Sequence, residues 1–245
     1  MIILCHACHQ PFEISQTGAY HCGHCGVVNV FGEIRHASEW EKTWKTRPLH
    51  GFMETAKHVI GSPIHFFSSY AVSESWLPPL AFGMIPIVVS YPVLFFYQTL
   101  WSLLPAALLG TLGKQDLAQI MTTPFVFFIL ATPILGAVTI AFSTALNHFF
   151  LWILKGNQSG LKGTFEVVCY SQAVQLFMII PLVGAIVAWV WQMVLLVVGF
   201  KEIHRISYRK SALTVLIPLI LCGGLVLFGI GILAAVLIPM FMKNV

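Results

Sequence analysis

The chain has 245 residues, of which 58% are hydrophobic and only 9% are charged. Soluble globular domains carry roughly 25% charged residues, so a chain this poor in charge cannot cover a water-soluble surface. The formal net charge is only +4, and the absence of a dense lysine and arginine stripe argues against nucleic acid as a partner. The composition therefore predicts an integral membrane protein surrounded by the lipid bilayer.

The first residues, MIILCHAC, contain no charged leader and only three apolar residues after Met1. A secretory signal peptide combines a basic start with an apolar stretch of roughly 7–15 residues. We therefore expect no cleavable signal peptide here, and we expect the N-terminal tail to stay in the cytoplasm, the side of synthesis.

Four of the six cysteines form two CxxC pairs in this tail. Cys5 and Cys8 are followed, after 13 residues, by Cys22 and Cys25. Two such pairs joined by a strand hairpin can present four thiolates in a tetrahedron, the geometry of structural Zn²⁺ sites. We predict a zinc ribbon in residues 1–32, with these four cysteines as the metal ligands.

The expected strands of this head are Pro11–Ile14, Ala19–His21 and Val27–Phe31, with residues 16–18 as a turn between the first two. A module of about 30 residues buries too little apolar surface to fold alone. Metal binding is therefore expected to supply its folding free energy.

Iron, c-type haem and histidine ligands are the alternatives to a zinc site made of four cysteines. Iron is the nearest rival, because it also accepts a tetrahedron of thiolates. The segment from Cys5 to His9 reads CxxCH, the attachment pattern of c-type haem, but the second CxxC pair and the expected cytoplasmic location argue against haem. Four neighbouring histidines could replace a cysteine ligand, although four thiolates already suffice and we expect exposed polar residues instead: His6, His9, His21 and His24.

Residues 33–75 are expected to form a polar connector and an amphipathic helix. Apolar and polar side chains separate onto two helical faces, with Phe52, Met53, Ala56, Val59 and Ile60 on one and Glu54, Lys57 and His58 on the other. Ser62 and Pro63 can begin a second short helix as its N-cap and first residue. The amphipathic helix either lies in the membrane interface or packs against the membrane helices, and both interpretations stay open.

The remainder, residues 76–245, is expected to be the membrane domain. Runs of 37, 34 and 32 residues without Asp, Glu, Lys, Arg or His lie at Leu77–Gly113, Val167–Phe200 and Ser211–Met242. About 20 apolar residues suffice to cross a bilayer. The middle run would be about 51 Å long as one helix, against a hydrocarbon core of about 30 Å. We therefore expect it to cross twice, with Pro181–Gly184 as the turn.

The distribution of charge orients these spans. Residues 1–75 hold five Lys or Arg and six acids, whereas the rest holds eight and three, and basic loops favour the cytoplasmic side. The predicted fold class is an all-α polytopic membrane bundle of about five transmembrane helices, with a cytoplasmic N-terminus and a small β-rich zinc-ribbon module. A hairpin at Gly223 and Gly224 would raise the count to six. The spans are expected near residues 80–108, 121–153, 165–181, 184–200 and 212–240.

Few groups in the membrane domain could carry chemistry. Asn147 and His148 are the best candidates, but the pair ends seven residues before Lys155 and is expected near the cytoplasmic interface. No phosphate loop, nucleophile elbow or metalloprotease signature occurs, so the sequence predicts that the protein is not an enzyme. Hydrogen bonds between helices are expected to account for four amides, those of Gln98, Gln172, Gln175 and Gln192.

The membrane domain resembles the Yip family, the Ypt/Rab-interacting polytopic membrane proteins. The resemblance covers roughly residues 50–240 and rests on Phe52–Lys57, Ser62-Pro63, Phe66-Phe67 and especially the segment Gly163–Ser207, GTFEVVCYSQAVQLFMIIPLVGAIVAWVWQMVLLVVGFKEIHRIS. It implies five spans and a cytoplasmic N-terminus. The head is similar to the zinc ribbons that begin prokaryotic members, which implies a bacterial inner-membrane protein.

Eukaryotic members carry an Asp-Leu-Tyr-Gly-Pro signature that is absent from this sequence, so binding to Rab-type GTPases is not carried over. We expect a non-enzymatic membrane adaptor whose zinc ribbon binds a cytoplasmic protein partner. The alternative is a small-solute transporter or channel around Asn147 and His148.

Overall fold

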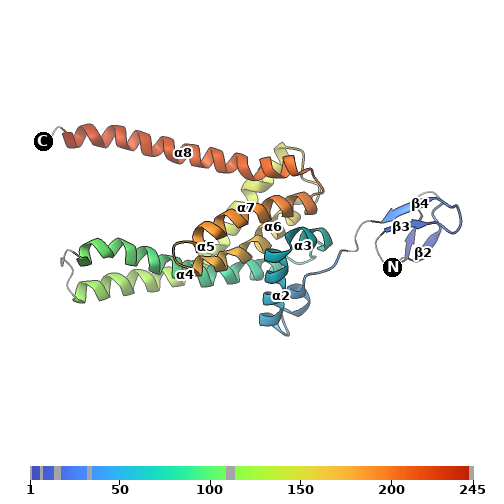
Figure 1. The fold of residues 1–245 in the computed structure, drawn as a ribbon, viewed down its shortest axis with the longest axis horizontal. Helices are drawn as coiled ribbons and strands as arrows, with labels where there is room; N and C mark the ends of the chain where they lie inside the picture. The colour runs from blue at the N-terminus through green and yellow to red at the C-terminus, as the bar shows by residue number, and fades with distance from the viewer. Residues whose placement is uncertain (1, 6–7, 14–17, 32–34, 109–113, 243–245) are drawn as a thin grey trace.

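The computed structural model describes residues 2–5, 8–13, 18–31, 35–108 and 114–242. Figure 1 shows two kinds of structure, a small N-terminal module of strands and a larger body of helices. The division follows the sequence, because the strands lie in the segment that contains both CxxC pairs and every long apolar run lies in the helical body.

The N-terminal module consists of two separate antiparallel hairpins. Strands β1 (Ile2–Leu4) and β2 (Pro11–Glu13) pair with Ile3 opposite Phe12, and strands β3 (Gly18–His21) and β4 (Val28–Phe31) pair with Tyr20 opposite Asn29. The pairing that we expected, between segments 11–14 and 19–21, is wrong for the described residues: each hairpin instead encloses one CxxC pair. Residues 16 and 17 of the expected turn lie outside the described residues.

Three short helices connect this module to the membrane domain. They are α1 (Glu39–Thr43), α2 (Pro48–Gly61) and α3 (Pro63–Ser69). Pro63 is the first residue of α3, as predicted, because proline fixes the backbone angle that a first helical turn requires. The side chain of Ser62 makes no capping hydrogen bond.

The long elements follow in order: α4 (Leu77–Leu108), α5 (Lys114–Ile153), α6 (Gly160–Ser171), the 3₁₀ helix η1 (Gln172–Ile179), α7 (Gly184–Ile203) and α8 (Tyr208–Met242). Among the side chains that the structure describes, three stretches are long and apolar enough to cross a membrane: Leu77–Pro105, Phe125–Ile153 and Gly184–Ile203. Their outward side chains include exposed Phe127, Leu130 and Phe142, which require lipid rather than water. The chain is a multi-pass membrane protein.

Two details of the expected spans are resolved by the backbone. The third expected span begins as α6 but tightens to 3₁₀ geometry in η1, and the chain then turns at residues 180–183, as predicted. The six-span alternative is wrong, because α8 continues through Gly223 and Gly224 without a turn.

The core is centred on the crossing of α4 and α6. A Cβ atom added at Gly83 of α4 would lie 2.9 Å from the carbonyl oxygen of Cys169 and 3.1 Å from its Cα, so the two backbones touch. Close backbone approach through glycine is a common way for membrane helices to pack. Phe82 and Tyr170, the neighbours of these two residues, are fully buried with ring centroids 4.9 Å apart.

The connector packs into this core and is not a free linker. Trp40 of α1 is 3% exposed, donates its indole N–H to the carbonyl of Pro78 at 2.6 Å, and lies against the rings of Phe52 and Phe82. Helix α2 buries Phe52, Ala56 and Val59, as the packed interpretation of its amphipathic face requires. Met53, expected on the same face, is 47% exposed.

Prediction: Gly83→Ala destabilises the protein by about 1–3 kcal/mol, because an added methyl group would push apart two backbones that cannot yield locally. Thermal unfolding in detergent should show a melting temperature lower by several degrees. Gly223→Ala is the matched control, since no atom lies within 4 Å of an added Cβ there and both glycines lie inside membrane-length helices. Equal melting temperatures for the two variants would contradict the close crossing.

Candidate functional site

The two CxxC segments form equivalent turns at the tips of the two hairpins. In the first, the Cys5 N–H donates to the Gln10 carbonyl at 3.0 Å and the His9 N–H donates to the Cys5 carbonyl at 2.9 Å. In the second, Cys22 donates to Val27 at 3.0 Å and Gly26 donates to Cys22 at 2.9 Å. His9 and Gly26, each directly after a second cysteine, both have left-handed backbone, with φ of 56° and 71°. One local geometry therefore occurs twice.

The turns bring the four predicted ligands together. The Sγ atoms of all four cysteines lie within 4.8 Å of one another, and the pairs Cys5–Cys25 and Cys8–Cys22 are each separated by 3.6 Å. Four sulfurs bound to one Zn²⁺ at about 2.3 Å would lie about 3.8 Å apart at tetrahedral angles, whereas a disulfide would need about 2.05 Å. The cysteines are thus close enough to bind a metal ion, and their spacing fits one.

The described histidines of the head take no part in this group. His9, His21 and His24 are exposed, and the four cysteines form the only cluster of this kind among the described residues. His6 lies outside the described residues.

A buried polar cluster fixes the connector beside the membrane helices. The carboxylate of Glu41 accepts hydrogen bonds from the hydroxyls of Tyr70, at 2.6 Å, and Tyr170, at 3.0 Å. Burial raises the pKa of Tyr70 well above its usual range, so this phenol remains a donor. Ser38, 6% exposed, lies 2.9 Å from the Tyr170 hydroxyl and caps α1 by accepting the Glu41 N–H.

Two further contacts hold the segments on either side of this cluster. Arg35 donates to the Glu202 carbonyl at 3.0 Å, beside the end of α7. The buried Glu166 carboxylate of α6 accepts the Ser73 N–H, at 3.0 and 3.2 Å, and so anchors the segment between α3 and α4. The His36 backbone pairs with the segment around Tyr70.

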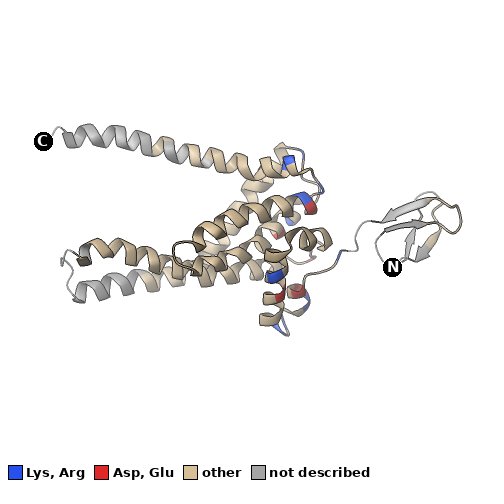
Figure 2. Ribbon diagram, viewed as in Figure 1, with Lys and Arg blue, Asp and Glu red and all other residues tan. Residues whose placement is uncertain are grey.

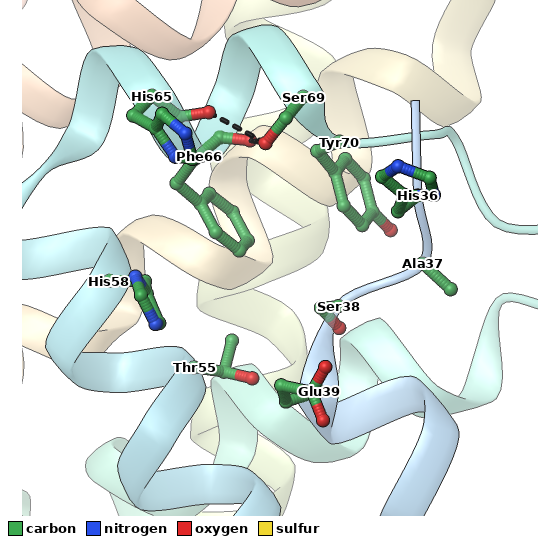
Figure 3. Close-up of a pocket in the computed structure, with 10 residues that line it drawn as sticks. All are labelled: His36, Ala37, Ser38, Glu39, Thr55, His58, His65, Phe66, Ser69 and Tyr70. Atoms are coloured by element: carbon green, nitrogen blue, oxygen red, sulfur yellow. Dashed lines mark hydrogen bonds between the residues drawn. The ribbon is translucent and has the colours of Figure 1, made fainter. Parts of the chain in front are cut away.

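A cavity of about 160 Å³ opens beside the connector (Figure 3). His36, His58 and His65 reach it from the connector, α2 and α3 in turn, and Phe66 and Tyr70 line it from α3 and its C-terminal end. These imidazoles form no metal-binding cluster among the described residues. The cavity combines polar rims with an apolar lining, as sites for small ligands and for anchoring side chains do.

A second buried polar network joins the ends of α5, α6 and α7. The Thr164 hydroxyl lies 3.0 Å from Nδ1 of His148 and 3.1 Å from Nε2 of His204. The backbone N–H of Ser159 lies 3.1 Å from Nδ1 of His204 and can only donate. Burial, with His148 nearby, lowers the pKa of His204 to about 4, so this imidazole is neutral.

Two fixed donors set the directions in this network. Because Nδ1 of His204 accepts, its proton is on Nε2 and is donated to the Thr164 hydroxyl oxygen. The amide nitrogen of Asn157 lies 3.2 Å from Nε2 of His148 and can only donate, so the His148 proton is on Nδ1 and also points at Thr164. The Thr164 hydroxyl donates in turn to the Gly160 carbonyl at 3.4 Å. Oδ1 of Asn157 has no partner among the described residues.

The polar residues of the membrane domain that we singled out from the sequence have different environments in the structure. Asn147 bonds to Ser143 of its own helix, His148 belongs to the network above, and Gln98 is exposed. Gln175 donates to Gln192 across helices, as predicted, whereas Gln172 bonds within its own turn.

The sequence analysis did not identify several residues of these clusters, namely Ser38, Glu41, Tyr70, Thr164, Glu166, Tyr170 and His204. Glu166 alone carried a visible signal, as a lone acid at the edge of an apolar run.

Prediction: Thr164→Val destabilises the fold, because it removes the hydroxyl that joins the two imidazoles, and each buried group without a partner costs about 1–3 kcal/mol. Thermal unfolding measures the loss. Thr139→Val is the control: Thr139 is exposed, its hydroxyl donates to Leu135 of its own helix at 2.8 Å and lies beside Tyr91, outside the network, and both substitutions exchange one β-branched residue for another. Equal melting temperatures for the two variants would show that the network does not stabilise the fold.

Among the side chains that the structure describes, the Lys, Arg, Asp and Glu residues of the helical body gather at one end, around α2, the end of α7 and the start of α8 (Figure 2). This end also holds both buried networks and the attachment of the connector. Outward aromatic side chains mark the same level, with Trp152 66% and Tyr208 48% exposed, as expected of residues at a membrane–water interface.

The comparisons with known proteins concern the membrane domain. A family model described as the Yip1 domain matches residues 57–231. No curated protein and no solved structure matches the chain. The matched range extends from α2 into α8 and contains Glu166, Tyr170 and the whole histidine network. Since it covers well over half of the sequence, the chain belongs to the Yip1 domain family.

Proposed function

We propose that the protein is a non-enzymatic membrane adaptor: a cytoplasmic zinc ribbon binds a cytoplasmic protein partner, and the helical body holds it at the bacterial inner membrane. The observation that carries this proposal is the docking of the connector. Glu41, close behind the module, is bonded to Tyr70 and Tyr170 of the buried core. A partner bound to the module would therefore be held close to the membrane domain and not on a long free tether.

The proposed topology has five spans, formed by α4, α5, α6 with η1, α7 and α8, and a cytoplasmic N-terminus. The grouping of described charge at one end supports it (Figure 2). Lys155 and Arg205 follow the ends of α5 and α7, Lys162 lies in the first turn of α6 and Lys201 in the last turn of α7. Basic loops favour the cytoplasm. Helix α6 has 12 residues and η1 has 8. These lengths correspond to about 18 Å of α-helix followed by about 16 Å of 3₁₀ helix. Together they are long enough to cross a hydrocarbon core of about 30 Å.

The proposed cofactor is one structural Zn²⁺ held by Cys5, Cys8, Cys22 and Cys25. Sulfur separations of 3.6 Å in two pairs support a closed tetrahedral site. Bound zinc would hold the two hairpins together and would supply no reaction, because a site with four protein ligands has no open position. Iron remains the nearest rival, since the same four thiolates suit it.

The transporter alternative has less support. His148 is held in a closed network with Thr164 and Asn157, and Asn147 bonds within its own helix. Asn147 borders a cavity between α5, α7 and α8, but its amide donor is used within its own helix, whereas the substrate-binding groups of transporters face the solute path. The cavity lined by His36, His58 and His65 supports the adaptor instead, as a second contact for a partner beside the connector (Figure 3).

Prediction: purified protein contains one zinc per chain by elemental analysis, and Cys22→Ser loses it together with the protease resistance of residues 1–32, because metal binding supplies most of the folding free energy of so small a module. His24→Ser, an exposed neighbour in the same turn, should keep both. Iron in place of zinc would change the identity of the metal but would still agree with metal-dependent folding. If residues 1–32 were equally resistant to protease without metal, metal-dependent folding would be refuted.

Prediction: in-cell crosslinking with mass spectrometry recovers a specific cytoplasmic protein with the wild type and loses it with Cys22→Ser, Cys25→Ser at matched membrane abundance. The control is His21→Ser, His24→Ser, which changes two exposed residues of the same hairpin and leaves all four thiolates. The adaptor proposal fails if the cysteine variant retains the same neighbours as the wild type. Solute flux in liposomes that His148→Ala abolishes would favour the transporter.

A further inference from the structure

Helices α5 and α7 end in the same unusual way. Lys155 and Arg205, each two residues beyond the end of its helix, have left-handed backbone, with φ of 51° and 52°. In each case the next N–H reaches back to the carbonyl five residues earlier: Gly156 to Leu151 at 2.7 Å and Ile206 to Lys201 at 3.1 Å. This closure is the Schellman motif, and its left-handed position normally holds glycine because a side chain there is disfavoured. Here both positions carry exposed cations.

The two helix ends are fixed against each other. A Cβ atom at Gly156 would lie 3.4 Å from Cδ1 of Ile206, so the residues that follow the two cations are in contact. Ser159 donates its backbone N–H to His204 and its hydroxyl to the Ile203 carbonyl. The buried histidine network thus keeps both left-handed residues at one place on the molecular surface.

The charge around this place is strongly positive. Segments 154–162 and 201–210 contain six Lys or Arg and one acid, Glu202, and Glu202 pairs with Lys201. Two of these cations lie over interfacial rings: Lys162 is 5.8 Å from the Trp76 ring centroid and Lys201 is 5.0 Å from that of Tyr208. Arg209 and Lys210, at the start of α8, are exposed.

An apolar cavity of about 240 Å³ lies between α5, α7 and α8, whose ends carry these cations. Leu146, Leu196 and Leu219 line it from the three helices, with Asn147 beside them. Asn147 precedes Lys155 by eight residues, or about 12 Å along the helix. The cavity is therefore on the membrane side of the cationic surface, at the depth where the acyl chains of a lipid begin.

We propose that the ends of α5, α7 and α8 form a binding site for one anionic glycerophospholipid of the adjacent leaflet. Lys155 and Arg205, with Arg209 and Lys210, bind the phosphate headgroup, and the cavity receives the upper part of an acyl chain. Basic surfaces at the cytoplasmic ends of membrane helices recognise anionic headgroups in this way. The site explains why two cations occupy backbone positions that favour glycine, since glycine would close the helices equally well but would bind no phosphate.

The test is native mass spectrometry of the delipidated full-length protein, titrated with phosphatidylglycerol or phosphatidylcholine. The wild type should bind phosphatidylglycerol more tightly. Lys155→Asn, Arg205→Asn should weaken that binding roughly twentyfold to thirtyfold, because each basic residue near an anionic lipid surface strengthens association by about fivefold. Asparagine tolerates left-handed backbone, so the variant should melt like the wild type without lipid.

The matched control is Lys42→Gln, Lys57→Gln, which removes two exposed cations from α1 and α2 and should keep the wild-type affinity. Leu219→Trp, which fills the cavity without changing charge, should weaken phosphatidylglycerol binding. Unchanged binding in the Lys155→Asn, Arg205→Asn variant, or equal affinity of the wild type for the two lipids, would overturn the proposal. Displacement of phosphatidylglycerol by millimolar inorganic phosphate would also overturn it, by showing a site for free phosphate.

Discussion

The half-buried carboxylate of Glu41 accepts hydrogen bonds from Tyr70 and Tyr170, both of which are buried. These contacts join α1, the end of α3 and α6, which are far apart in the sequence. A buried hydroxyl that loses its partner is costly, so the two tyrosines depend on the acceptor that α1 supplies. The connector therefore behaves as part of the membrane domain.

The same constraint explains the network at the ends of α5, α6 and α7. Away from water every donor needs an acceptor, and the donors of Ser159, His204, Thr164, His148 and Asn157 each find one. These residues come from three helices and the loop between two of them. The network consequently fixes the helix ends, and with them the cations that follow α5 and α7.

The N-terminal module is organised by different physics. Its hairpins are three or four residues long on each side, too short to be stable in water without support. What brings them together is the convergence of four sulfurs, two from each turn. The module and the body thus differ in what holds them: four converging sulfurs, close enough to bind a metal ion, lie at the centre of one, and buried apolar side chains form the core of the other.

Much of the architecture was accessible from the sequence, because the signals are local. CxxC spacing identified the four cysteines that converge, uncharged runs identified the long helices, Pro63 marked the start of α3, and Pro181–Gly184 marked the turn before α7. The strand pairing of the head was assigned wrongly, since strands of three residues carry too little pattern to choose a partner. The hairpin at Gly223 was not formed either, because glycine is tolerated inside membrane helices.

Composition and short spacings were therefore enough to predict the membrane helices and the four cysteines that converge. The fold was needed to show that Glu41 meets Tyr170 across 129 positions and that Thr164 meets His204 across 40. It was also needed to show that Lys155 and Arg205 follow the ends of neighbouring helices. Such pairings have no local signature: a glutamate, a threonine or a lysine at a helix end has the same appearance in the sequence whether its partner is water or a buried side chain from another helix.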